Sequence, residues 1–184
     1  MQDELQHIIE GCLNGDRKAQ QALYKKFARW GFTICRRYVA REEKAEEALH
    51  DGFLKIFKKI DSYKAEKGEL KAWMARIFIN CALTVTKREA FNNSFNSLSE
   101  VVYEPVSQDK FFKFDPEEIL RFLKKMPIGY KTVFNLYILD DYSHKEIAMK
   151  LNISEITSRS QLRKAKLWIK EHVSLDELKS SLET

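Results

Sequence analysis

The sequence predicts an all-α fold: two small helical domains joined by a flexible linker, the C-terminal domain being a helix-turn-helix. Only 6 Gly and 3 Pro occur in 184 residues, and these are the residues that most disfavour helix interiors. Most segments repeat apolar residues at the period of an amphipathic helix, and none shows the sustained alternation of a strand. The length suits one ordinary domain or two small ones. The net charge of +5 fits a polyanionic partner without requiring one.

The cysteines and the N-terminal residues indicate the compartment. Cys12, Cys35 and Cys81 are odd in number, widely spaced and flanked by apolar residues, so they encode neither a disulfide framework nor a CxxC-type metal site. No apolar run reaches transmembrane length, and the acidic start MQDELQ lacks the basic and apolar blocks of a signal peptide. We therefore expect buried, reduced thiols in a cytoplasmic protein without membrane insertion.

Three classes of catalytic site are missing from the sequence. It contains no Gly-rich phosphate loop and no pairing of a nucleophile with a base, and His7, His144 and His172 are scattered among polar positions without partners at metal-ligand spacing. We expect no catalytic residue, no metal and no cofactor, and hence no enzyme.

The N-terminal half shows three helical patterns, each with one apolar face. The first follows Gly15 and Asp16 and buries Leu23, Phe27, Trp30, Ile34 and Tyr38. The second buries Leu49, Phe53, Ile56 and Ile60, and the third buries Leu70, Met74, Ile77, Cys81 and Val85. Gly52 interrupts the second pattern at a cost of about 1 kcal/mol relative to Ala, and we interpret it as a position of close helix packing.

The exposed side of the second helix is acidic near its start, where Glu43, Glu46, Glu47, His50 and Asp51 lie. One interpretation is a solvated face that the helix dipole favours, and composition alone prefers it. The other is a docking surface for a basic partner helix. The residues themselves leave both open.

The third helix carries a second stripe beside its core stripe: Trp73, Arg76, Asn80, Thr84 and Lys87. An aromatic plane, an amide and two cations suit single-stranded DNA, whose bases stack and whose backbone attracts positive charge. A lone Trp on a helix is nevertheless more often part of the core. The polar loop before this helix, residues 61–69, holds Gly68 and is positioned to pocket a flipped base.

A change in composition separates the two halves. Residues 92–114 are rich in Asn and Ser, contain Pro105 and show no sustained helical period, as is typical of a linker. Its five aromatic residues predict that part of it packs on a domain or a partner.

Two short helices and a tight turn are predicted between residues 142 and 170. Ser143 and Glu146 form a capping box, Asn152 can adopt the left-handed conformation that ends a helix, and Ser154 can cap the next helix. Leu162, Ala165 and Ile169 share one face of that helix, and a separate stripe holds Arg159, Arg163, Lys166 and Lys170. Such a second helix enters the major groove in helix-turn-helix proteins, although cations also line ordinary solvated helices. A second capping box, at Ser174, predicts a further short helix.

From about residue 15 to residue 173 the chain resembles the extracytoplasmic-function (ECF) group of bacterial sigma factors. AEEALHDGFLKIF (residues 45–57) is similar to the acidic helix that docks on the clamp coiled coil of the largest polymerase subunit. KGELKAWMARIFINCAL (67–83) is similar to the element that opens and reads the minus-ten sequence, and residues 115–168 to the minus-thirty-five reader. The resemblance implies a region-2-like domain (1–93), a linker (94–114) and a region-4-like domain (115–184).

The resemblance also assigns roles by position. Polymerase docking falls to Glu47, His50 and Asp51, with His50 replacing the usual Gln. Minus-ten DNA binding falls to Tyr63, Lys64, Trp73, Arg76, Asn80, Lys87 and Arg88. Minus-thirty-five DNA binding falls to Arg159, Ser160, Arg163 and Lys164. Ile156 stands where the family often has a small residue, and Ser158 where an aliphatic residue is common.

The expected function is that of a promoter-specificity subunit that binds core RNA polymerase, through the clamp coiled coil and the flap, and promoter DNA. An anti-sigma protein is a further candidate partner. One alternative is a stand-alone helix-turn-helix regulator of duplex DNA, against which the stripe at Trp73 argues. Another is a helical adaptor that binds protein alone, in which case the cations near Arg159 form an ordinary solvated face.

Overall fold

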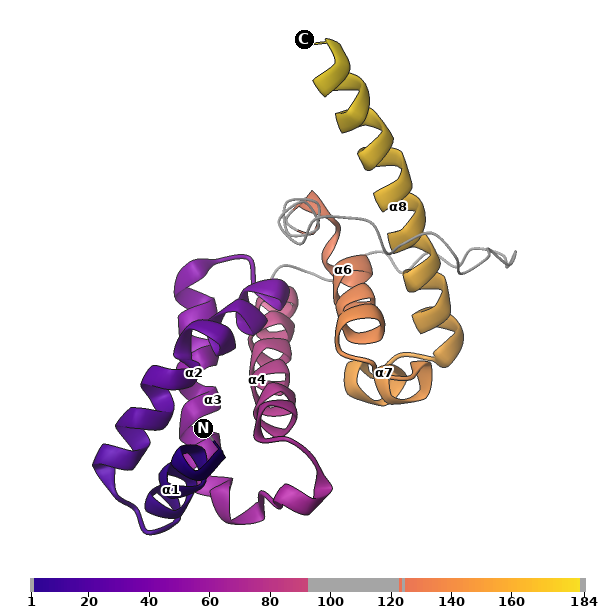
Figure 1. Ribbon diagram of the computed structural model, residues 1–184. Coiled ribbons are helices and arrows are strands. Elements are labelled where there is room, and N and C mark those ends of the chain that lie inside the picture. The colour runs from indigo at the N-terminus through magenta and orange to yellow at the C-terminus, as the bar shows by residue number, and fades with distance from the viewer. Residues whose placement is uncertain (1, 93–122, 124, 183–184) are drawn as a thin grey trace. The chain divides into compact units, whose positions relative to one another are not determined.

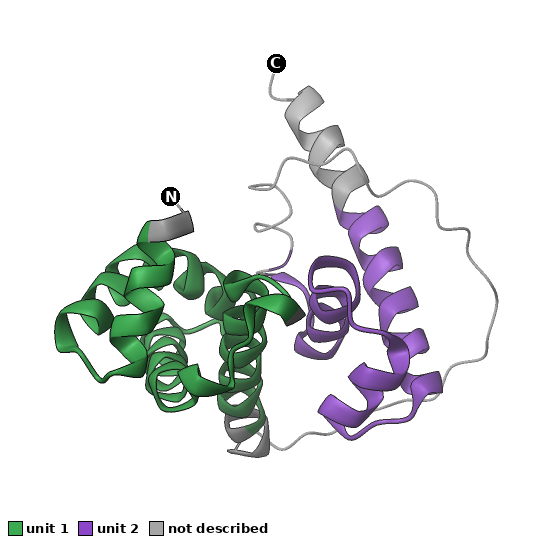
Figure 2. Cartoon of the chain, turned by 60° about the horizontal axis from the view of Figure 1, so that its bottom comes forward, with its two compact units in different colours: residues 1–95 green, residues 96–184 purple. Residues whose placement is uncertain are grey.

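The computed structural model describes residues 2–92, 123 and 125–182, and the secondary structure within them is helical, without a strand (Figure 1). The chain divides into two compact units, residues 1–95 and 96–184 (Figure 2). The predicted all-α fold with a C-terminal helix-turn-helix is confirmed, whereas the predicted linker lies outside the described residues. Within the described residues, no helix combines the length and the apolar character needed to span a membrane.

Unit 1 contains four α-helices among its described residues: α1 Gln2–Leu13, α2 Arg17–Tyr38, α3 Glu42–Lys59 and α4 Leu70–Asn92. Helices α2, α3 and α4 pack on one another, and α1 packs on α2. The three predicted helices correspond to α2, α3 and α4. Helix α1 was not predicted, although Ile9 and Cys12, three residues apart, are both buried. Its close contact with α2 rests on small residues, because a Cβ on Gly11 would lie 2.5 Å from that of Ala19.

Local interactions fix where the helices of unit 1 begin and end. Gly15 takes a left-handed φ of +73°, and the Asp16 carboxylate then accepts a hydrogen bond of 2.9 Å from the backbone N–H of Lys18 to cap α2. Helix α3 has Glu42 in its first turn and lysines in its last, charges that oppose the helix dipole. These features stabilise the start of α2 and both ends of α3.

Phe78 of α4 is the centre of the core of unit 1. Its side chain is fully buried and makes edge-to-face contacts with Phe53 and Trp30, at centroid distances of 5.2 and 6.0 Å. A Cβ built on Gly52 would lie 2.4 Å from the ring, and one on Gly31 would lie 2.8 Å from it. The ring therefore fits between α2 and α3 only because both helices have glycine there, which confirms the interpretation of Gly52.

The predicted core stripe of α4 was wrong at one position and missed several buried residues, Phe78 among them. Leu70, Met74, Cys81 and Val85 are buried as expected, but Ile77 is only half-buried. Phe78, which no stripe included, is fully buried. The reason is that α4 packs against both α2 and α3, so its buried surface is wider than the single stripe that a period of 3.6 selects.

Unit 2 contains α6 Ile128–Phe134, a π-helical turn η3 Asn135–Leu139, α7 His144–Leu151 and α8 Glu155–Leu182. Helices α6 and α7 both pack on α8. The predicted face of α8 is buried at Leu162, Ala165 and Ile169, facing a core that includes Leu136 and Ile147.

The turn between α7 and α8 follows the sequence prediction. Ser143 and Glu146 form the full capping box, and Asn152 ends α7 in the left-handed conformation, with φ 56° and ψ 51°. The Ser154 hydroxyl accepts a hydrogen bond of 3.0 Å from the backbone N–H of Thr157 and so caps α8. These contacts fix the angle between the two helices of the helix-turn-helix.

The C-terminal segment differs from the prediction. We expected a separate short helix beginning at the Ser174 capping box, but α8 continues without a break to Leu182. No Gly or Pro interrupts residues 155–182, so a propagating helix has nothing to stop it.

Candidate nucleic-acid interface

The acidic face of α3 is partly exposed. His50 is exposed, whereas Glu47 and Asp51 are half-buried. The Glu47 carboxylate forms a 2.6 Å ion pair with Lys44, one turn earlier. These three residues share one helix face at spacings of three and four, so the structure brings the predicted docking positions together.

Leu54 adds an apolar group to the same α3 face, and sequence reasoning missed it. Its side chain is 45% exposed, and it follows His50 by four residues and Glu47 by seven. The sequence did contain a signal for it: Leu54 does not fall on the apolar face of Leu49, Phe53 and Ile56, so it was not needed for the core. Carboxylates beside an exposed Leu offer a basic, amphipathic helix both opposite charge and apolar area.

The second stripe of α4 lies at the surface. Arg76, Asn80 and Lys87 are exposed, and Trp73 is half-buried. Arg88 continues the helix, but its side chain is outside the described part of the chain. The stripe therefore combines an aromatic side chain with cations and an amide on one exposed face, as single-strand binding requires.

The loop before α4 packs against the start of this stripe. It forms two 3₁₀ turns, η1 Ile60–Ser62 and η2 Ala65–Lys67, between which Tyr63 is half-buried and Lys64 exposed. The rings of Tyr63 and Trp73 are 5.7 Å apart, and the Tyr63 hydroxyl donates a 3.3 Å hydrogen bond to the Gly68 carbonyl. Gly68 has a φ of +139°, which side chains disfavour. Loop and helix thus form one aromatic surface flanked by Lys64 and Arg76.

The predicted recognition residues lie on or beside the exposed face of α8. Arg159 is exposed and pairs with Glu155 at 3.4 Å, while Ser160 and Arg163 are half-buried. Lys164 is also half-buried, and its ammonium lies 5.9 Å from the centroid of the Tyr130 ring on α6. Arg159, Ser160 and Arg163 lie on one face at spacings of three and four, whereas Lys164 lies at its edge, toward α6.

Ser158 and His144 lie inside the helix-turn-helix, where sequence reasoning did not put them. Ser158 has no exposed surface and its hydroxyl is hydrogen-bonded to Nδ1 of His144 at 2.9 Å. The His144 ring stacks on Tyr137 at 4.5 Å. Burial lowers the pKa of His144, and the nearby Arg159 lowers it further. Ser158 therefore joins α8 to α7 instead of facing a ligand.

The three cysteines are buried and free, as expected. Burial raises the pKa of the Cys35 thiol to about 12 and also raises that of Cys81, although Lys55 Nζ lies 3.3 Å from the Cys81 sulfur and opposes the rise. Thiols with raised pKa values are poor nucleophiles. Among the described residues, no group of three or more His, Cys, Asp or Glu side chains is placed to hold a metal ion.

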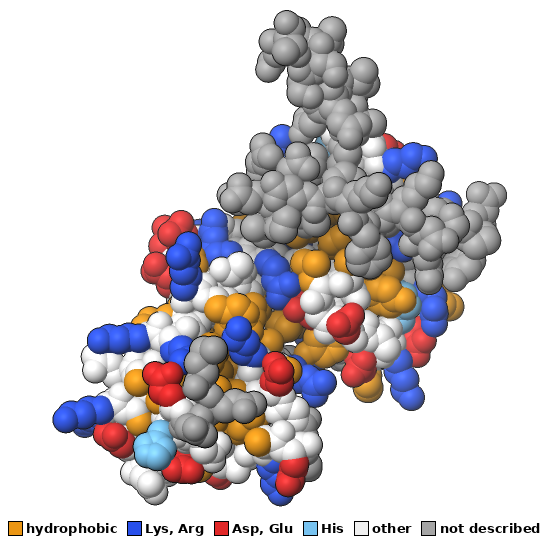
Figure 3. Space-filling model, in the orientation of Figure 1, with side chains coloured by type: hydrophobic (Ala, Val, Ile, Leu, Met, Phe, Trp, Pro, Cys, Tyr) orange, Lys and Arg blue, Asp and Glu red, His pale blue; other side chains and the backbone are white. Residues whose placement is uncertain are grey.

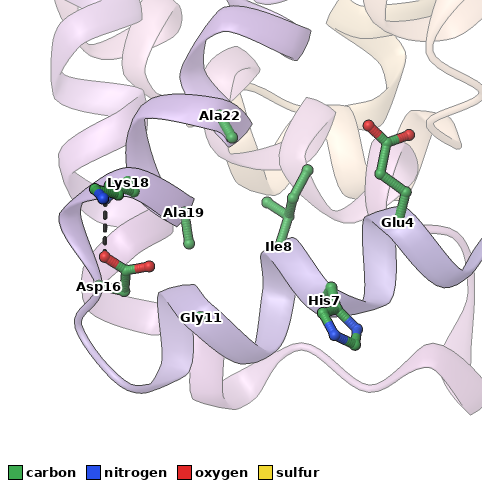
Figure 4. Close-up of a pocket in the computed structure, with 8 residues that line it drawn as sticks. All are labelled: Glu4, His7, Ile8, Gly11, Asp16, Lys18, Ala19 and Ala22. Atoms are coloured by element: carbon green, nitrogen blue, oxygen red, sulfur yellow. Dashed lines mark hydrogen bonds between the residues drawn. The ribbon is translucent and has the colours of Figure 1, made fainter.

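A surface hollow lies between α1 and α2 (Figure 4), away from the predicted site residues. Its two carboxylates already have partners: Asp16 caps α2, and Glu4 pairs with Lys26 at 3.4 Å. The face shown in Figure 3 intersperses cations with carboxylates, so the excess positive charge is not gathered in one patch there. The α4 and α8 faces remain the candidate nucleic-acid interfaces.

Comparison with known proteins matches both units to one family. Residues 23–91 match the family model of sigma-70 region 2, and residues 116–169 match that of sigma-70 region 4. The chain belongs to the ECF sigma factors. It is 23% identical over 180 residues to the ECF RNA polymerase sigma-E factor of Haemophilus influenzae, covering 91% of this chain and 94% of that protein. It is 25% identical over 128 residues to SigM of Bacillus subtilis, covering 68% and 77%.

Two solved structures have a similar fold. One is CnrH in complex with the cytosolic domain of CnrY, at a TM-score of 0.50 and 16% identity, covering 92% of this chain and 96% of that chain. The other is the sigma factor RpoE in complex with the anti-sigma factor NepR from Bartonella quintana, at a TM-score of 0.51 and 18% identity, covering 85% and 97%. As a sigma factor, the present chain directs promoter-specific transcription initiation by RNA polymerase.

Proposed function

We propose that unit 1 of this sigma factor docks on core RNA polymerase through Glu47, His50 and Asp51 of α3, and that the clamp coiled coil of the largest subunit receives them. The acidic face, with Leu54 exposed at its C-terminal end, supports a basic helical partner. His50 offers one hydrogen bond per ring nitrogen, and Leu54 offers apolar area that becomes buried on docking.

We infer that the α4 stripe holds the separated non-template strand at the minus-ten element. The observation that carries this inference is the contact between Tyr63 and Trp73, which presents two aromatic rings beside Arg76 and Lys64. Stacking of one base on such a ring is worth about 1–3 kcal/mol, comparable to the cost of unstacking a base pair. Asn80 reads a base edge, and Lys87 and Arg88 hold backbone phosphates. Binding only the open strand shifts the duplex toward melting.

We further propose that α8 enters the major groove of the minus-thirty-five element. Its first turns present Arg159, Ser160 and Arg163 on the face opposite the buried Leu162. Cations at these positions hold phosphates or read guanine edges. Lys164, half-buried beside Tyr130, holds a flanking phosphate.

The remaining partners follow from the family. We propose contact between unit 2 and the polymerase flap, and action in the cytoplasm, where the polymerase works. The similar folds of CnrH and RpoE were solved with CnrY and the anti-sigma factor NepR, and on that analogy we propose an anti-sigma partner for this chain. The chain catalyses nothing itself, because the polymerase performs the chemistry.

Transcription with purified core RNA polymerase tests the proposal. A pool of promoter fragments is transcribed with and without the protein, and we expect discrete new start sites only in its presence. Trp73→Ala should abolish opening of the selected promoter, measured by permanganate reactivity of its thymines, while leaving polymerase binding intact. Thr33→Ala, at an exposed position of α2 outside this stripe, is the control. Absence of new start sites, together with duplex binding by the protein alone, would favour a stand-alone regulator instead.

A further inference from the structure

Ile156 is an apolar residue at a position where the structure gives it no internal role. It lies in the first turn of α8, and its side chain is 73% exposed, more than any other large apolar side chain among the described residues. Packing does not explain it, because burial is small. Helix propensity does not explain it either, because a β-branched residue is a weaker helix former than Ala.

The position of Ile156 in the sequence of α8 places it on a defined face of the helix. Arg159, Ser160 and Arg163 follow it by three, four and seven residues, so all four share one face of the helix. The opposite face is buried at Ser158 and Leu162. Ile156 is therefore the N-terminal member of the face that we assign to DNA.

Hydrogen bonds and an ion pair stabilise the first turn of α8, which carries Ile156. The Ser154 hydroxyl accepts from the Thr157 N–H at 3.0 Å and is hydrogen-bonded to the Thr157 hydroxyl at 2.9 Å. Glu155 is engaged by Arg159 at 3.4 Å. The backbone of the first turn is therefore fixed by the Ser154 cap and by the ion pair of Glu155 with Arg159. Ile156 presents a branched apolar side chain from this turn.

The major groove offers one apolar group on its base edges, the C5 methyl of thymine, and the N-terminal residues of a recognition helix reach the base edges. We propose that Ile156 recognises a thymine methyl in the minus-thirty-five element and is a specificity-determining residue of this sigma factor. This proposal rests on the proposed function of unit 2.

Deoxyuridine differs from thymidine only by lacking that methyl, which allows a direct test. After selection of the minus-thirty-five element with the holoenzyme, each thymine on either strand is replaced singly by deoxyuridine and open-complex formation is measured. We expect one replacement to lower the apparent association constant about threefold to tenfold, the effect of losing one buried methyl contact. In Ile156→Ala the same thymidine and deoxyuridine promoters should bind equally well.

Two controls separate this contact from general effects. Met149→Ala removes an apolar side chain from α7 that is similarly exposed, at 69%, and should retain the full discrimination. Ile156→Val keeps a branched side chain and should retain part of it. If the parent tolerates deoxyuridine at every position while still initiating at its promoter, the assignment of Ile156 is wrong and the sigma function stands. If promoter-specific initiation itself fails, both are overturned.

Discussion

Gly52 allows a quantitative test of how the core of unit 1 is built. In Gly52→Ala the new Cβ would lie 2.4 Å from Cδ1 of Phe78 and 2.7 Å from Cε1, against ordinary contacts of 3.4 Å or more. The ring must therefore move by about 1 Å. Its movement toward α2 is restricted because its other edge already lies close to the backbone of Gly31, where a built Cβ would be 2.8 Å away. Overpacking of this kind costs about 2–3 kcal/mol, and the gain in helix propensity offsets about 1 kcal/mol.

We therefore expect Gly52→Ala to lower the free energy of unfolding of unit 1 by about 1–2 kcal/mol. Urea denaturation of the full chain measures it, followed by the fluorescence of Trp30 and Trp73 in a Trp168→Phe background. The same substitution in Phe78→Leu, where the smaller side chain leaves room, should be neutral or stabilising by up to about 1 kcal/mol.

The helix-propensity part of this estimate has its own control. Glu46 is exposed on the same helix, so the difference between Glu46→Ala and Glu46→Gly measures the preference of α3 for Ala without any packing change. If Gly52→Ala stabilises unit 1 by that same difference, the added Cβ does not clash with Phe78 at any cost in stability. That result would refute our reasoning.

Three further predictions concern surface charge, pH and thiol chemistry. Asp51→Lys should abolish binding to immobilised core polymerase without loss of helicity, whereas Glu10→Lys on α1 should not; equal affinity of the Asp51 variant and the parent would contradict docking through α3. The stability of unit 2 should fall as the pH drops below about 6.5, because burial lowers the pKa of His144 and the unfolded chain then takes up the proton more readily. His144→Gln should lose that part of the pH dependence in amide hydrogen exchange of α7, and an unchanged profile would exclude His144 as its cause. Because the pKa of Cys35 is raised to about 12, a disulfide reagent at about pH 8 should label Cys35 slowly in the folded chain and fast in the unfolded chain. Fast labelling of Cys35 in the folded chain, located by peptide mapping, would show that α2 opens.

Local signals in the sequence were sufficient where the structure depends on neighbouring residues. The Ser143 capping box and the left-handed Asn152 involve atoms within a few residues of one another, so their identities predict the turn directly. The exposed stripe of Trp73, Arg76 and Asn80 followed from periodicity in the same way. Its role in binding DNA remains a prediction that comes from resemblance and residue chemistry.

Features that depend on contacts between helices were not predictable in this way. Phe78 is central because glycines on two other helices leave space for its ring, and no pattern within α4 contains that information. The role of Ser158 was not predicted, because it depends on His144 of α7, whose ring nitrogen lies 2.9 Å from the Ser158 hydroxyl. The break expected at Ser174 failed for the opposite reason: a strong local cap was outweighed by a helix already propagating through it.

The unbroken course of α8 has a practical consequence for measurement. From Ile156 to Leu182 the helix rises about 40 Å, at 1.5 Å per residue. A spectroscopic label near its C-terminal end would therefore lie far from the residues that we propose contact DNA, and yet move with the same helix. Distances from such a label to a dye on the polymerase would follow the movement of α8 during initiation without substituting any of the proposed DNA-binding residues.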